Sequence, residues 1–299
     1  MALEVGYRAI DTAYDYQNSE GIGEALQEAF QSGELERKDL FITTKVEGGL
    51  NASRTFEEHE TNLKNLQVDY VDLLLIHFPD YISPQGDLTG SKKMRQDQWR
   101  GTSLSLSLSL TFTTTYLNTH THAAMEKLHK EGKARAIGIS HYCRRQLDDV
   151  LEIATVKPAV NQVEFHIGMG SAGVNATDDR AYLESKGVTF QSFSPLCGPC
   201  CMGDTTGKCT FNKDLITGDM VTSIGAKYNK TGAQVSLKWQ VQQGIPVIPK
   251  TNNKDHLEQN IALFGWELSK EDMDTLTSAT SPPVSGGGDG LTSGDWAMP

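Results

Sequence analysis

The sequence predicts an α/β fold, a TIM-type (β/α)₈ barrel, from three observations. Runs of β-branched and aliphatic residues alternate with segments of helical spacing along the 299 residues. Seven such strands are expected, and each after the first is preceded by a helix, which implies parallel strands with helical crossovers. Each strand also ends at a polar side chain, as at the edge of a barrel where active sites lie. A doubly wound sheet is the alternative, but Gly21 and Gly23 open a helix without a preceding strand in contact and do not form its GxGxxG turn.

The expected elements follow one another with little interruption. The first strand ends at Asp11, within YRAIDTAYDYQN. A helix over residues 53–66 is expected to be capped by Ser53. Proline stops the strand over 71–77. The remaining strands are expected over 40–45, 134–140, 159–164, 188–194 and 246–250, and the remaining helices over 21–30, up to 128, 146–154, 180–185, 231–242, 255–261 and 269–279.

Residues 1–281 are predicted to form one barrel domain, and residues 282–299 a Gly/Ser-rich tail. The pattern of strands and helices fails between about residues 81 and 121. Within it, residues 101–122 read GTSLSLSLSLTFTTTYLNTHTH. The low complexity and unusual length of this insert favour a translated intron over a functional loop.

Composition excludes several classes of protein. The formal net charge is −11 and the sequence pI about 5.2, so we expect no nucleic acid or anionic membrane as a partner. No run approaches the roughly 20 apolar residues of a membrane-spanning helix. Five cysteines, an odd number, do not form a disulfide framework, and a cytoplasmic location is expected. Nothing resembles a coiled coil, and we expect a monomer.

Three early strands end on ionisable side chains, Asp11, Lys45 and His77, and Tyr16 lies just beyond the first. Since parallel strands end at one edge of a sheet, these four residues predict a single site there. Each alone has an ordinary structural explanation. Asp11 with Thr12 could cap a turn, Lys45 could be a surface charge, Tyr16 an interface aromatic and His77 a satisfied core histidine.

With these residues in place, the chain resembles the aldo-keto reductases. The matching segments, in the order of that family, are GYRAIDTAYDYQN, LFITTKV, DLLLIHFP, MEKLHKEGKARAIGIS, NQVEFH, FSPL and IPKTNNKDHLEQN. The match covers nearly the whole chain. In that family the first barrel strand precedes the GYR segment, so the resemblance implies that the chain is truncated by about one strand and most of one helix.

The resemblance implies NADPH-dependent reduction of an aldehyde or ketone, with four catalytic residues. Tyr16 would be the general acid that protonates the carbonyl oxygen as hydride reaches the carbon. Lys45 would depress the phenol pKa, which is ordinarily near 10, and Asp11 would hold the lysine by an ion pair. His77 would donate a hydrogen bond that orients the substrate carbonyl. Phe78 would line the substrate pocket with His77, and no metal is needed.

The resemblance also assigns a nicotinamide cofactor, NADPH in preference to NADH. Ser140 and Gln162 would hold the carboxamide, Phe193 would stack on the nicotinamide ring, Ser194 and Leu196 would contact the pyrophosphate side, and Lys250, Thr251 and Asn260 would surround the adenosine end. The chain departs from the family pattern at four positions: His141 for asparagine, Phe193 for tyrosine, His256 for arginine and Gln259 for glutamate. Losing the guanidinium at His256 should weaken the preference for NADPH, so NADH remains possible.

Other signals are weaker. Cys197-Gly-Pro-Cys200 matches a thioredoxin-like redox motif, but it follows FSPL without a βαβ unit opening at it. A zinc site from Cys197, Cys200 and Cys209 lacks a second paired motif. His120 and His122 form the HxH of metal-dependent barrel hydrolases, yet they fall in the insert. The main alternative is a non-catalytic nucleotide-binding barrel or a regulatory subunit, against which the complete set of four residues argues.

Overall fold

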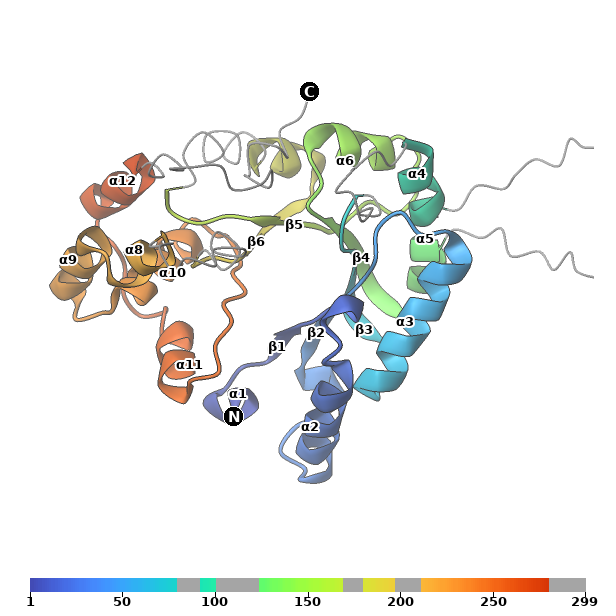
Figure 1. Ribbon diagram of the computed structural model, residues 1–299, viewed down its shortest axis with the longest axis horizontal. Coiled ribbons are helices and arrows are strands. Elements are labelled where there is room, and N and C mark those ends of the chain that lie inside the picture. The colour runs from blue at the N-terminus through green and yellow to red at the C-terminus, as the bar shows by residue number, and fades with distance from the viewer. Residues whose placement is uncertain (80–91, 101–123, 169–179, 197–210, 280–299) are drawn as a thin grey trace, which may run out of the picture. The chain divides into compact units, whose positions relative to one another are not determined.

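The computed structural model describes residues 1–79, 92–100, 124–168, 180–196 and 211–279 (Figure 1). They form two compact units, one of residues 8–160 and the other of residues 1–7 with 161–299. These are called here the first unit and the second unit. The predicted insert, the C-terminal tail, the cysteine motif and the HxH pair all fall outside the described residues.

The first unit is built on four parallel strands that are neighbours in chain order. They are β1 (Ala9–Asp11), β2 (Phe41–Val46), β3 (Val71–Ile76) and β4 (Ala134–Ser140). Asp11 pairs in register with Thr43, and Lys45 with Leu75. Every residue of β3 is buried, as expected for a strand covered on both faces. The register therefore brings the carboxyl ends of β1, β2 and β3 to one edge of the sheet.

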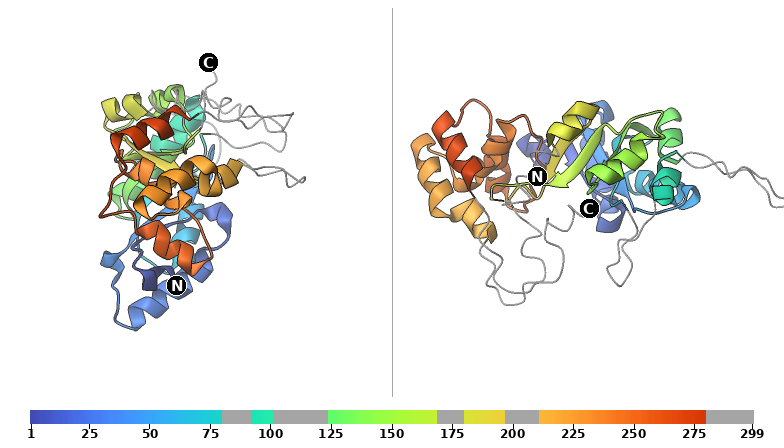
Figure 2. Two further views of the ribbon diagram at one scale, coloured as in Figure 1. Left: turned by 90° about the vertical axis from the view of Figure 1, so that its left-hand side faces the viewer. Right: turned by 90° about the horizontal axis from the view of Figure 1, so that it is seen from above.

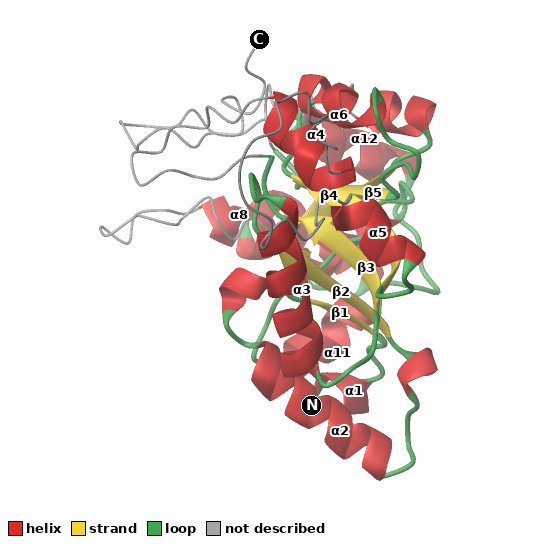
Figure 3. Ribbon diagram, turned by 90° about the vertical axis from the view of Figure 1, so that its right-hand side faces the viewer, coloured by secondary structure: helices red, strands yellow, loops and turns green. Residues whose placement is uncertain are grey.

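Helices join these strands, and Figure 3 shows α3 and α5 lying against one face of the strands. The bounds are η1 Tyr14–Tyr16, α2 Ser19–Gln31, η2 Arg37–Asp39, α3 Ala52–Leu66, α4 Lys92–Arg100, α5 Ala124–Lys130 and α6 Arg144–Leu151. Gly23 lets α2 approach α3 closely, because a Cβ there would lie 2.2 Å from the carbonyl oxygen of Asn65. The predicted cap of α3 is wrong by two residues. Asn51 caps it, its side chain accepting from the backbone N–H of Arg54.

The amino ends of β2 and β3 hold a buried carboxylate, that of Asp72. Its Oδ2 accepts from Arg37 Nη2 at 2.7 Å and from the backbone N–H of Ile42 at 2.9 Å. Its Oδ1 accepts from Arg135 Nη1 at 3.2 Å. The guanidinium of Arg37 also lies 4.0 Å above the ring of Tyr70. This carboxylate is fully partnered, and we refer to the group as the Asp72 cluster.

The second unit contains two neighbouring strands and a group of helices. The strands are β5 (Val160–Glu164), whose first residue belongs to the first unit, and β6 (Thr189–Phe193). The helices are α1 Ala2–Val5, a helix over residues 180–186, α8 Phe211–Thr217, α9 Asp219–Tyr228, α10 Gly232–Val241, α11 Lys254–Ile261 and α12 Lys270–Ser278. Figure 2 shows α9, α10 and α12 packed together. Trp239 of α10 donates its Nε1–H to Thr277 of α12 at 3.0 Å.

The strand predicted over residues 246–250 is wrong. Only Val247 forms a bridge, with Ser192 of β6. The backbone N–H of Ser192 donates to Pro246 at 2.9 Å, and that of Ile248 donates back to Ser192 at 3.2 Å. The segment lies beside β6 but does not continue as a ladder, because Pro246 and Pro249 lack backbone N–H groups. Helices α4, α8 and α9 had no counterpart in the prediction.

The described part of the chain contains no helix long and apolar enough to cross a membrane.

Candidate active site

Asp11, Lys45, His77 and Tyr16 come together at the carboxyl ends of β1, β2 and β3, as the sequence predicts. Asp11 is the last residue of β1, and Lys45 is the last but one of β2. His77 follows β3, and its backbone N–H donates to Val46 at 2.8 Å, which extends the ladder by one bond. Tyr16 closes the short helix η1 that follows β1. Backbone pairing therefore sets the spacing of Asp11, Lys45 and His77, and η1 places Tyr16.

Lys45 is the buried centre of the site, with 1% of the residue exposed. Its ammonium donates to Asp11 Oδ1 in a short ion pair and to the carbonyl oxygen of Thr12 at 3.1 Å. Burial lowers the pKa of Lys45, and the charge of Asp11 and the hydrogen bond to it oppose that change. The Nζ atom lies 5.1 Å from the ring centroid of Tyr16. A fixed positive charge thus stands beside the phenol.

The pKa of Tyr16 departs from our expectation. It is raised to about 12, first by burial of the ring and then by the negative charges of Asp11 and Asp15. The prediction that Lys45 depresses this pKa is therefore not met in this structure. Burial of the phenol is the largest cause, because it disfavours the charged phenolate, and the two nearby carboxylates add to it. At neutral pH the hydroxyl keeps its proton, while 48% of the residue stays exposed.

His77 lies next to Tyr16, with ring centroids 5.5 Å apart in an edge-to-face arrangement. Its Nδ1 is 3.4 Å from Asp15 Oδ2. Burial lowers the pKa of His77 to about 3, with further contributions from Lys45 and His141. The ring is therefore neutral across the physiological range and carries one N–H, which serves as a hydrogen-bond donor.

Aromatic rings continue from His77 to the end of β4. Phe78 stacks on His77 at 4.4 Å and contacts the ring of His141 at 4.4 Å. His141 Nδ1 lies 2.9 Å from the carbonyl oxygen of His77 and 3.0 Å from Ser140 Oγ. Its φ of 62° is uncommon for a residue other than glycine. Ser140 and His141, predicted to bind cofactor, thus adjoin the predicted substrate residues His77 and Phe78.

The other predicted cofactor residues belong to the second unit. Gln162 is buried in β5, and its Nε2 donates to Gln191 Oε1 at 2.9 Å. Phe193 ends β6, and Ser194 and Leu196 follow it, all of them half-buried.

Lys250, Thr251 and His256 gather around the start of α11. Thr251 Oγ1 accepts from the backbone N–H of Asn253 at 3.1 Å and lies 3.4 Å from His256 Nδ1. Asn253 caps the helix. An exposed ammonium, a hydroxyl and an imidazole at a helix N-terminus are suited to a phosphate group. Gln259 and the buried Asn260 lie further along α11.

Sequence reasoning overlooked two carboxylates beside the site, Asp15 and Glu47. Asp15 stands directly before Tyr16, and Glu47 stands two residues after Lys45. A hydrogen bond to Asp15 raises the pKa of Glu47 to about 7, with burial and the charges of Asp15 and Glu58 adding to the shift. Their positions in segments already assigned to the site were the available signal, since polar residues after parallel strands meet at one edge.

The strand-helix alternation and this set of residues define an oxidoreductase of the aldo/keto reductase family. The sequence model of that family matches residues 1–281, so the chain belongs to it. Three of the relatives are named as reductases of glyoxal, aldose and D-xylose, and the family uses nicotinamide cofactors. The chain is therefore an enzyme that carries out oxidoreduction of carbonyl substrates.

Particular relatives sharpen the assignment. Glyoxal reductase of Bacillus subtilis is 34% identical over 276 residues, 92% of this chain and 79% of that protein. Aldose reductase B of Dictyostelium discoideum is 34% identical over 285 residues, 94% and 82% of the two chains. The solved aldose reductase of Schistosoma japonicum superposes with a TM-score of 0.72 at 29% identity, covering 94% of this chain and 82% of that one. The TIM-type barrel predicted from the sequence is the fold of these relatives.

Proposed function

We propose that this enzyme reduces an aldehyde or ketone to the alcohol with NADPH, and that Tyr16 supplies the proton. The observation that carries the proposal is the buried Lys45–Asp11 ion pair beneath Tyr16, with His77 edge-on to the phenol. These side chains come from three strand ends: Asp11 and Tyr16 from β1, Lys45 from β2 and His77 from β3. A purely structural role would not need a buried cation next to a tyrosine ring.

The chain's own residues divide the work of proton transfer and orientation. Bound NADPH supplies the hydride for the carbonyl carbon. Tyr16 holds a proton at its hydroxyl and donates it to the carbonyl oxygen as negative charge develops there. Lys45 stabilises the phenolate left behind, because the ammonium lies 5.1 Å from the ring. His77 donates a hydrogen bond to the same carbonyl oxygen, and Phe78 lines the substrate pocket beside it.

Residues of the second unit are assigned to the cofactor. Lys250 and Thr251 would hold the 2′-phosphate at the start of α11, with Gln259 and Asn260 near the adenine. Gln162 would hold the carboxamide, as would Ser140 of the first unit, and Phe193 would stack on the nicotinamide. Ser194 and Leu196 would contact the pyrophosphate. We further propose that the enzyme acts as a monomer in the cytosol, without a nucleic-acid or membrane partner.

The reaction is tested by following NADPH absorbance with 4-nitrobenzaldehyde as the acceptor. Tyr16→Phe should lower kcat by about a thousandfold or more, because the proton donor is lost. Tyr14→Phe, which removes a hydroxyl two residues away on the same short helix, is the matched control and should keep kcat within about twofold. Equal turnover in wild type and Tyr16→Phe would overturn the proposal.

The cofactor assignment has its own test. His256→Arg restores a permanent positive charge at the start of α11 and should raise the NADPH-to-NADH ratio of kcat/KM by about tenfold. Lys254→Arg, on the same helix, keeps the charge and should leave the ratio unchanged. An unchanged ratio of kcat/KM in His256→Arg would show that the start of α11 does not bind the cofactor.

A further inference from the structure

His77, which orients the substrate in the proposed reaction, is held through its main chain from two sides. It is the first residue after β3. Its backbone N–H donates to the carbonyl oxygen of Val46, the last residue of β2, at 2.8 Å. Its own carbonyl oxygen lies 2.9 Å from Nδ1 of His141, the residue that follows β4. The ends of the two strands that flank β3 thus each supply one contact to the main chain of His77.

The contact with the carbonyl oxygen fixes the tautomer of His141. A main-chain carbonyl oxygen can only accept a hydrogen bond, so Nδ1 of His141 is the donor. Burial lowers the pKa of His141 to about 4, so the ring is neutral in the physiological range and carries a single N–H. Ser140 Oγ, at 3.0 Å from the same nitrogen, is a second acceptor within reach of that proton. The His141 ring therefore keeps its proton on Nδ1, facing the end of β3.

The conformation and packing of His141 suit this contact. Its φ of 62° lies in the left-handed region, which histidine and asparagine enter more readily than most residues with a side chain. Its ring contacts that of Phe78, with centroids 4.4 Å apart, and lies 6.0 Å from that of His77. Phe78 in turn stacks on His77 at 4.4 Å. The His141 ring is therefore packed against the segment whose main chain it holds.

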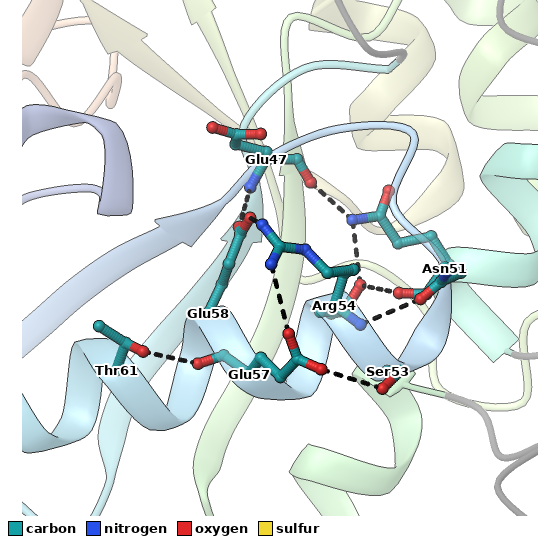
Figure 4. Close-up of polar contacts among 9 residues, drawn as sticks. Glu47, Asn51, Ser53, Arg54, Glu57, Glu58 and Thr61 are labelled. Atoms are coloured by element: carbon teal, nitrogen blue, oxygen red, sulfur yellow. Dashed lines mark hydrogen bonds and ion pairs between the residues drawn. The ribbon is translucent and has the colours of Figure 1, made fainter.

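The segment after β2 is held in a different way, by side chains of two helices. The backbone N–H of Glu47 donates to Glu58 Oε2 of α3 at 2.9 Å, as Figure 4 shows. The carbonyl oxygen of Glu47 accepts from Gln98 Nε2 of α4 at 2.6 Å. Side chains thus hold the main chain after both strands. After β3, however, the contact comes from a residue beside the substrate pocket and goes to the residue that orients the substrate.

We propose that His141 is a positioning residue for the reduction, and that it acts by donating its Nδ1–H to the main-chain carbonyl of His77. The proposal rests on the proposed function, in which the His77 ring donates a hydrogen bond to the substrate carbonyl. With its N–H and C=O both held, His77 keeps its ring beside Tyr16, at a centroid distance of 5.5 Å. Without the His141 donor the backbone after β3 gains freedom, and the ring loses the geometry that the transfer needs. This role differs from the cofactor contact predicted for His141 from the sequence.

The first test is the kinetics of three variants at His141. Asparagine places an amide N–H where Nδ1 stands and tolerates a positive φ, so His141→Asn should keep kcat within about twofold. Glutamine places its amide where Nε2 stands, so His141→Gln should lower kcat by about tenfold. His141→Gly removes the donor without backbone strain and should lose about as much. In all three variants the Kd of NADPH, measured by fluorescence, should stay within about twofold of wild type.

His129 supplies a matched control at the opposite end of β4. Its Nδ1 lies 3.0 Å from the carbonyl oxygen of Ala134, the first residue of that strand, so it makes the same kind of contact away from the site. His129→Gln should keep kcat within about twofold. Wild-type kcat in both His141→Gln and His141→Gly would overturn the proposal. A weakened affinity for NADPH at unchanged kcat would overturn it too, because His141 would then act on the cofactor.

The second test does not depend on turnover, so it separates failure of this proposal from failure of the proposed function. His77–Phe78 is the one His–Phe pair in the 299 residues. Enzyme labelled with carbonyl-13C histidine and 15N phenylalanine therefore gives a single correlated resonance, that of the His77 carbonyl. This resonance should move upfield in His141→Gln and His141→Gly, because the oxygen loses a hydrogen bond.

The same resonance should stay near its wild-type position in His129→Gln and in His141→Asn. His141→Asn also removes the aromatic ring, so it separates loss of the hydrogen bond from loss of the ring current. An unmoved His77 carbonyl resonance in His141→Gln contradicts the contact even if reduction is observed. An equal displacement in His141→Asn and His141→Gln contradicts it as well, since only the second variant lacks the donor.

Discussion

The buried charges at the two ends of strands β2 and β3 are compensated in different ways. At the amino ends, the Asp72 carboxylate receives two guanidiniums and a backbone N–H, so cations exceed anions. At the carboxyl ends, one ammonium, Lys45, is paired with Asp11, while the further carboxyls Asp15 and Glu47 lie nearby.

Several ionisable groups around the carboxyl ends are strongly perturbed. Around the carboxyl ends, the pKa of Tyr16 is raised to about 12, that of Glu47 is raised to about 7, and that of His77 is lowered to about 3. At the amino ends, both oxygens of the Asp72 carboxylate have hydrogen-bond partners. The same strands therefore carry a stabilising charge cluster at their amino ends and a reactive cluster at their carboxyl ends, as in barrels generally.

Removing both charges at the carboxyl ends should destroy activity while sparing the fold. The double variant Asp11→Asn, Lys45→Met is expected to lose about a thousandfold or more in kcat. Its free energy of unfolding should stay within about 1 kcal/mol of wild type, because deleting a whole buried ion pair is often neutral. Steady-state NADPH oxidation and urea unfolding measure the two quantities. Substantial residual turnover would contradict the assignment of this end as the catalytic one.

Removing the single carboxylate at the amino ends should do the opposite. Asp72→Asn leaves Arg37 without its anion and should destabilise the protein by about 3 to 5 kcal/mol in urea unfolding. Turnover per folded molecule should remain within about twofold, because the Asp72 cluster does not touch the reacting groups. A selective loss of kcat in a fully folded Asp72→Asn sample would contradict the claim that the amino ends serve stability and not catalysis.

A buried histidine near the amino ends offers a test by pH. His59 on α3 is fully buried, its Nε2 lies 3.3 Å from the carbonyl oxygen of Lys133, and burial lowers its pKa from 6.5 to about 4. Between those values the unfolded chain binds a proton that the folded chain does not. Stability should therefore fall as the pH drops from about 6.5 to about 4.

The contribution of His59 to that loss is about 3 kcal/mol, at about 1.4 kcal/mol for each pKa unit. His59→Gln should reduce the pH dependence of the unfolding free energy by this amount, measured by urea unfolding at both pH values. His256→Gln replaces an exposed histidine and serves as the control, with an unchanged pH dependence. An identical slope in His59→Gln and wild type would show that the imidazole is not buried neutral.

Much of the catalytic end could be predicted because it depends on local pattern and strand order. Apolar runs such as residues 71–76 are strands in any context that buries both faces, and their ends identified Asp11, Lys45 and His77. The position of Tyr16 followed from its place just after β1. The direction of its pKa did not follow, because it depends first on how deeply the phenol is buried and then on the charges of Asp11 and Asp15 around it, which no sequence pattern encodes.

Helix α4 shows the limit of periodicity. Its sequence KKMRQDQWR is almost entirely polar, so it was left unassigned. The helix forms because tertiary partners hold several of its buried polar side chains. Arg95 donates to Asp149 Oδ2 at 2.6 Å, and Trp99 donates to the carbonyl oxygen of Val156 at 3.2 Å. Burial of polar residues with distant partners is invisible to a count of apolar positions.

The most direct test of the account is the fate of hydrogen in the product. NADPH carrying deuterium at both C4 positions is incubated with wild-type enzyme and 4-nitrobenzaldehyde, and the alcohol is analysed by mass spectrometry. The account predicts one deuterium on the carbinol carbon of every product molecule, and loss of this product in Tyr16→Phe. An alcohol without deuterium, or equal deuterated product from both proteins, would contradict it.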